Sequence, residues 1–224
     1  KNRSKRYHRK FVEESSWHIH SSWWTRKYEQ FLFDGKKENE LSGIIWFLAK
    51  ESLTFPWQWM RFCYWIIWIS SSYLAKFAID LDNKGTRFQS ENEENSWLRY
   101  DFKERKVRPT HYSITSKPCG QGDYHPQHWV IEGSNTGEND WKILDTRNGI
   151  TVLNAKSVTH TFDIQEKLKP DEFFRFLRIR QTGKNAAGTD YLGLSALEYF
   201  GSLIWNEILF KLTYLNSKKT NNFF

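Results

Sequence analysis

The sequence predicts an all-β protein, a sandwich or barrel, with one short helix on its N-terminal side and irregular termini. From residue 77 onward, apolar residues alternate with polar ones in short runs, which is the pattern of half-buried strands. Turn residues such as Gly, Pro, Asn and Asp separate these runs at intervals of about 8–15 residues. No helical periodicity interrupts them, so the repeated strand-and-turn pattern favours a sheet protein.

The predicted strands follow one another closely along the chain. They cover Phe77–Leu81, 98–102, 112–115, Trp129–Gly133, a run from Trp141 through Ile143, 158–164, 174–179 and Leu192–Phe200. In the run 174–179 the apolar phase shifts by one residue, because Phe174 and Phe176 are followed by Leu177 and Ile179. This shift predicts either a bulge or a strand that is apolar on both faces.

One helix is predicted upstream of the strands. Leu41, Ile44, Ile45 and Leu48 recur at helical spacing and form a single apolar face. A helix this short is marginal alone in water. We expect it to dock either on the following domain or on a domain upstream.

The segment from 53 to 75 is rich in Trp, Ile and Phe, and Phe62–Ile69 is continuously apolar. β-branched and aromatic residues followed by serines favour a first buried strand. The alternative is a membrane-spanning helix. Pro56, Gln58 and Arg61 interrupt that pattern, and the apolar run is much shorter than the roughly 20 residues a span requires.

The net charge of +7 is concentrated at the start of the chain, where the first ten residues hold six Lys and Arg and no acid. The remainder is close to neutral, which argues against nucleic-acid binding by the folded part. The two cysteines, Cys63 and Cys119, have no metal-binding spacing. Sparse cysteines indicate a reducing compartment, so we expect a cytoplasmic protein. The alternative is a single disulfide between the two cysteines.

Four sequence strings together resemble the coagulation factor V/VIII type C, or discoidin, domain. They are AIDLD at 78–82, WLRYDF at 97–102, WVIEGS at 129–134 and LSALEYFG at 194–201. The resemblance covers about residues 66–202 and implies a jelly-roll β-sandwich of the galactose-binding-like fold.

RPTHYSI at 108–114 and RQTGKN at 180–185 resemble an intracellular branch of that family, found in protist proteins and in proteins with BTB domains. The cysteine bracket of secreted relatives is missing. The resemblance therefore implies an adaptor domain inside the cell and argues against a membrane partner. The predicted divisions are a basic leader (1–27), a linker with the amphipathic helix (28–61), the sandwich (62–202) and a C-terminal tail (203–224).

The same resemblance implies a structural calcium site, for which the candidate ligands are Asp80, Asp82, Thr86 and Glu198. Oxygen ligands from one turn plus a distant carboxylate suit Ca²⁺. The alternative is that the two aspartates only order their turn. Cys119, His125 and His128 offer soft ligands on one loop, but no fourth ligand follows at a finger-like spacing.

Loops at one end of the sandwich are the expected binding site. The candidate residues are Tyr73, Gln89, Asn92, His125, His128, Gln181, Lys184, Asn185, Asp190 and Tyr191. No catalytic motif is present: there is no nucleophile elbow, and Gly183-Lys184 lacks the other residues of a phosphate-binding loop. The sequence therefore predicts a non-catalytic module that binds a protein. The alternative is a lectin-like module for glycans with a structural calcium.

Overall fold

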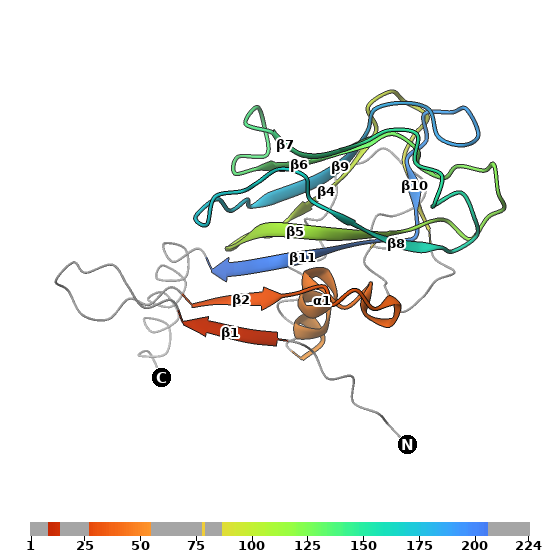
Figure 1. Ribbon diagram of the computed structural model, residues 1–224. Helices are drawn as coiled ribbons and strands as arrows, with labels where there is room; N and C mark the ends of the chain where they lie inside the picture. The colour runs from red at the N-terminus through yellow and green to blue at the C-terminus, as the bar shows by residue number, and fades with distance from the viewer. Residues whose placement is uncertain (1–8, 14–26, 55–77, 79–86, 206–224) are drawn as a thin grey trace, which may run out of the picture.

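The computed structural model describes residues 9–13, 27–54, 78 and 87–205. Its strands form antiparallel sheets that face each other across one core, with a single helix beside them (Figure 1). This confirms the all-β jelly-roll sandwich with one short N-terminal helix. The described part contains no helix long and apolar enough to cross a membrane.

The larger sheet has the strand order β1-β2-β11-β5-β8. These strands are β1 (Arg9–Glu13), β2 (Lys27–Phe31), β11 (Ala196–Trp205), β5 (Arg105–Thr115) and β8 (Thr159–Asp163). The pairing of β11 with β5 shifts register at Phe200/Gly201, where Gly201 lies opposite Pro109. Gly201 has φ +140°, and a Cβ there would lie 2.1 Å from the Arg108 carbonyl oxygen, so this bulge requires glycine.

The second sheet has the strand order β4-β9-β6-β7, and a short third sheet pairs β10 with β3. Their bounds are β3 (Phe88–Gln89), β4 (Trp97–Asp101), β6 (Trp129–Ser134), β7 (Lys142–Arg147), β9 (Phe176–Gln181) and β10 (Gly193–Leu194). The phase shift predicted at 174–179 corresponds to two features. Phe174 forms an isolated bridge with Val107, and β9 then starts with Phe176 and Leu177 both buried.

The core between the sheets is aromatic and contains one buried polar chain. Trp129 Nε1 donates to Tyr112 Oη at 2.9 Å, and Tyr112 Oη donates to Asp145 Oδ2 at 2.5 Å. Arg147 Nε reaches the same Asp145 oxygen at 2.7 Å, which compensates the buried carboxylate. Burial and the neighbouring carboxylate raise the pKa of Tyr112, so its hydroxyl stays a donor.

The helix α1 (Ile44–Thr54) packs on β11, and Ile44, Ile45 and Leu48 of the predicted apolar face are buried in the main core. Of the two docking partners expected for it, the following domain is therefore the one it uses. A 3₁₀ turn, η1 (Lys37–Asn39), precedes it.

The structure differs from the predicted divisions at both ends of the sandwich. β1 lies within the predicted leader, 1–27, whereas β2 begins at the last residue of that leader and continues into the predicted linker, 28–61. β2 joins the larger sheet by pairing with β11. β11 continues past the predicted boundary at 202. Lys27–Phe31 has no clear alternation of apolar and polar residues, so its pairing with a strand far along the chain was not visible in the sequence.

β7 also departs from the pattern expected of it. Ile143 is 51% exposed, whereas its neighbour Leu144 is buried. The cause is a register shift between Ile131 and Glu132 in the pairing of β6 with β7. Residues beyond a bulge point to the opposite face of the sheet from the one that simple alternation predicts. The alternation of apolar and polar residues in the sequence does not reveal such a bulge.

Several predictions fall outside the described residues. These are the strands proposed at 62–69 and 77–81, apart from Ala78, and the alternative of a membrane span over 53–75 beyond the end of α1. Tyr73, Asp80, Asp82 and Thr86 also lie there.

Candidate binding rim

Three loops meet at one end of the sandwich, and we call them together the rim: residues 90–96, 117–128 and 182–192. The backbone N–H of Asp190 donates to Asn92 Oδ1 at 2.9 Å, which joins the first loop to the third. The Ala186 N–H donates to the His125 carbonyl at 3.0 Å, which joins the third loop to the second. Segments far apart in the sequence therefore form one surface (Figure 1).

The third loop is held by Asn185, whose side chain is buried. Its amide nitrogen donates to Thr189 Oγ1 at 2.7 Å and to the Tyr191 carbonyl at 2.9 Å. Its oxygen accepts from the N–H groups of Ala187 at 3.0 Å and Thr189 at 3.1 Å. A side-chain amide can donate two hydrogen bonds and accept two, and Asn185 makes all four of them within this loop. Asn185 thus shapes the rim instead of facing a ligand.

The other predicted polar contacts of this loop are also engaged. Lys184 and Asp190 form an ion pair with each other. Gln181 is buried, and its amide nitrogen reaches the Thr189 carbonyl at 3.5 Å. An exposed ion pair contributes little to stability. Lys184 and Asp190 can therefore exchange this pairing for contacts with a partner.

The two predicted histidines occupy different environments. His125 is completely buried, and its Nε2 lies 2.8 Å from the Gly120 carbonyl, while its Nδ1 has no partner. Cys119 Sγ lies 3.9 Å from the same Nε2. His128 is partly exposed, and its Nδ1 accepts from the Gly149 N–H at 3.3 Å. Within the described residues no three His, Cys, Asp or Glu side chains gather as metal ligands, so Cys119, His125 and His128 do not form a soft-metal site.

A buried lysine, which the sequence did not single out, lies at the centre of the rim. Lys117 is 2% exposed, its Nζ donates to Gln89 Oε1, and it lies 4.6 Å from the centre of the Tyr124 ring. In the described part of the chain no carboxylate pairs with it. Burial lowers the pKa of Lys117, and the neighbouring Arg87 adds to that effect.

Aromatic rings from two loops lie beside this lysine. Tyr124 and Tyr191 meet edge to face with ring centres 5.4 Å apart, and both are partly exposed. Such a pair presents apolar surface with a polar tip, which is the composition of an interface anchor. Gly193 makes room for the arrangement, because a Cβ there would lie 2.5 Å from Lys117 Cδ and 2.9 Å from the Tyr124 carbonyl oxygen.

Glu198 is the only predicted calcium ligand that lies among the described residues, and its carboxylate holds the start of α1. Its Oε1 accepts from the Ile45 N–H at 2.7 Å and its Oε2 from the Trp46 N–H at 2.9 Å. Burial raises the pKa of Glu198 to about 7, although these N–H groups favour the charged form. Both oxygens face helix donors, an arrangement that suits a cap on the helix rather than a calcium ligand.

The rim thus brings together Asn92, Lys184, Asn185, Asp190 and Tyr191. It also includes two residues that sequence reasoning missed, Lys117, which bonds Gln89 of β3, and Tyr124, which packs on Tyr191. The only available signal was the density of Pro and Gly in the loop 117–127, which located the loop but not its contacts. Burial raises the pKa of the Cys119 thiol, and Asp123 raises it further, so Cys119 is not an activated nucleophile.

No protein-family model matches the chain. Among curated proteins, it is 27% identical over 124 residues to the E3 ubiquitin-protein ligase Ufd4 of Drosophila melanogaster, covering 55% of this chain and 4% of the ligase. It is 32% identical over 99 residues to the E3 ubiquitin-protein ligase hecd-1 of Caenorhabditis elegans, covering 44% of this chain and 4% of that ligase. The chain therefore corresponds to a small part of either relative's length.

Similar solved structures include the carbohydrate-binding module CBM62 of Clostridium thermocellum Xyl5A, with 18% identity, a TM-score of 0.47 and coverage of 62% of this chain and 94% of that one. A fucolectin from striped bass, Morone saxatilis, has 21% identity, a TM-score of 0.43 and coverage of 60% and 44%. The sheets described above are those of the sandwich that the discoidin resemblance implies, so that resemblance is confirmed at the level of the fold.

Proposed function

We propose that the chain is a non-catalytic, protein-binding module of an intracellular adaptor, and that it binds its partner through the rim. The observation that carries this proposal is the partly exposed pair of Tyr124 and Tyr191, set on loops that are fixed from within. Rigid aromatic side chains provide large contact areas at low entropic cost and dominate many protein interfaces.

The polar side chains of the rim favour a protein partner over a glycan. A sugar is held by several side-chain donors and acceptors that converge on its hydroxyl groups. On the described rim, Asn185, Gln89 and Lys117 bond to groups of the protein itself. The position of Glu198 at the start of α1 likewise gives no support to the calcium of the lectin-like alternative.

The two ligase relatives are consistent with a recognition role. The matched stretch covers 4% of each ligase, so a module of this size in a much longer chain would serve to recruit a partner. We propose recruitment of a protein in the cytoplasm as the role of this chain too.

The experiment compares Tyr191→Ala with Leu32→Ala, which removes an exposed apolar side chain outside the rim. Proteins captured from cell lysate are identified by mass spectrometry for each variant and for the parent chain. We expect a reproducible partner that is lost with Tyr191→Ala and retained with Leu32→Ala.

A glycan array, run with and without EDTA, tests the alternative. Sugar binding that disappears with EDTA would replace the adaptor proposal with the lectin-like one. Capture that is equal for both variants would remove the rim from the proposal.

A further inference from the structure

The outer face of the four-stranded sheet carries a layer of arginines and aromatic rings, and it borders the rim where Arg180 donates to Asn95. We call it the arginine–aromatic face and define it as Trp97, Arg99, Glu132, Phe176, Arg178 and Arg180. The register places these residues side by side: Trp97 lies opposite Arg180, and Arg178 lies between Arg99 and Glu132.

Two of the three arginines share one carboxylate. Glu132 Oε2 accepts from Arg178 Nε at 2.6 Å, and Glu132 Oε1 accepts from Arg180 Nη2 at 2.9 Å. Arg178 also lies 3.8 Å from the centre of the Trp141 ring, and Arg180 Nη1 donates to Asn95 at 2.8 Å. These two guanidinium groups are occupied by the fold.

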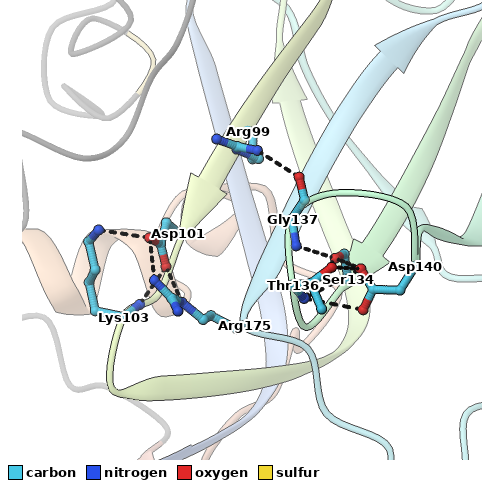
Figure 2. Close-up of polar contacts among 8 residues, drawn as sticks. All are labelled: Arg99, Asp101, Lys103, Ser134, Thr136, Gly137, Asp140 and Arg175. Carbon is cyan, nitrogen blue, oxygen red and sulfur yellow. Dashed lines mark hydrogen bonds and ion pairs between the residues drawn. The ribbon is translucent and has the colours of Figure 1, made fainter.

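Arg99 differs from its neighbours because no carboxylate among the described residues forms an ion pair with it. Its Nη1 donates to the Gly137 carbonyl at 3.1 Å, which is the only hydrogen bond from this side chain in Figure 2. Its guanidinium carbon lies 5.3 Å from the ring centres of both Trp97 and Phe176. A guanidinium has five N–H donors, so most of those on Arg99 are left for water or a ligand.

The orientation of Arg99 is set by a rigid loop. Asp140 accepts from the hydroxyl groups of Ser134 and Thr136 (Figure 2). It also accepts from the N–H of Asn135 at 2.8 Å. Burial alone would raise the pKa of Asp140, but these donors outweigh it and hold that pKa well below its usual range. Gly137, at φ +80°, ends this turn and presents its carbonyl to Arg99. A guanidinium held in this way loses little freedom when it binds.

The charge around Arg99 favours an anion. Nearby, Asp101 is already bound by Arg175 at 2.8 Å and by Lys103 at 2.7 Å (Figure 2). Together with the residues of the face and Asp140 of the loop that holds Arg99, this makes five cationic side chains against three carboxylates. Burial lowers the pKa of Arg99, and the charges of Arg178 and Arg175 add to that effect, although Asp101 opposes it.

We propose that the arginine–aromatic face is a second binding surface, which takes an acidic segment of a protein partner and pairs one of its carboxylates with Arg99. The planar fork of the guanidinium matches both oxygens of a carboxylate. Trp97, whose ring centre lies 5.3 Å from the Arg99 guanidinium carbon, offers apolar contact for residues beside that carboxylate. This surface is independent of the proposed rim function.

The test uses the full chain and a fluorescein-labelled peptide of glutamate, aspartate and leucine. A matched peptide replaces each acid by its amide. We expect Arg99→Gln to weaken binding of the acidic peptide by about tenfold or more, as expected for the loss of a charge-assisted pair. Binding should also weaken with added salt, and the indole N–H resonance of Trp97 should shift on titration.

The matched control is Arg108→Gln, on β5 of the other sheet. Arg108 also donates to a carbonyl, that of Pro170 at 3.0 Å, and lies 5.5 Å from a phenylalanine ring, that of Phe173. Equal losses for both variants, equal binding of the amide peptide, or an unshifted Trp97 resonance would overturn the proposal. If Arg99→Gln does not fold, Arg99→Lys keeps the charge but not the fork, and unchanged affinity in that variant would overturn the pairing.

Discussion

The rim and the arginine–aromatic face both carry polar side chains on a β-sandwich, but they use them in opposite ways. On the rim, Asn185 makes its hydrogen bonds within its own loop and Lys117 donates to Gln89 of β3, so these polar groups determine the shape of the surface. On the sheet face, the strands already fix the shape, and Arg99 keeps donors for an outside partner. Residue type alone therefore does not distinguish a structural polar group from a binding one; its partners do.

The largest expected effect comes from comparing Asn185→Ala with Arg99→Ala in free energy of unfolding. Asn185→Ala removes four side-chain hydrogen bonds from a buried position, and we expect a loss of about 3 kcal/mol. Arg99→Ala removes one bond to a carbonyl and stacking on two rings, for about 1 kcal/mol. Urea unfolding measures both. Equal losses of unfolding free energy would mean that the fold depends on the polar groups of the rim no more than on those of the arginine–aromatic face.

A second test concerns Glu198, a buried carboxylate that the fold satisfies with helix N–H groups. Its folded pKa is raised from 4.5 to about 7. A raised pKa in an acid means that the folded state favours the proton, so this group stabilises the fold fully below pH 4.5 and loses that contribution as the pH rises to about 7.

Glu198→Gln removes this titration. We expect the stability of the variant relative to the parent to improve by about 2 kcal/mol between pH 5 and pH 8, less than the full linkage value because the helix donors relax. Thermal unfolding across this pH range measures the difference. A constant difference would show that Glu198 keeps one protonation state throughout, as a carboxylate bound to a cation does.

The sequence predicted the sandwich because local alternation reports burial directly. Leu98 and Tyr100 face the core as their spacing predicts, and so do Trp129 and Ile131. β2 could not be found in this way, since Lys27–Phe31 is fixed by pairing with β11 rather than by its own pattern. The bulge at Leu144 in β7 likewise reversed the exposure expected of Ile143.

The location of the rim was predictable from loop composition, but the roles of its residues were not. Asn185 and Lys184 are adjacent and equally polar in sequence, yet one is buried and the other exposed. Lys117 is flanked by Ser116 and Pro118, which give no sign of a buried cation. These roles depend on which loops meet, and that is a property of the tertiary fold.

The smallest expected effect concerns the space beside Lys117 and sharpens the view that the rim is shaped from within. In Gly193→Ala, the new Cβ would lie 2.5 Å from Lys117 Cδ and 2.9 Å from the Tyr124 carbonyl oxygen. The lysine stem can shift but the backbone oxygen cannot do so freely, so we expect a loss of about 1–2 kcal/mol. Gly120→Ala is the control, since a Cβ there would have no neighbour within 4 Å. Because Gly193 lies in the two-stranded sheet and Arg99 in the four-stranded sheet, peptide binding through Arg99 should be unchanged in Gly193→Ala while partner capture through Tyr191 weakens. Loss of both activities together would mean that the two surfaces are coupled.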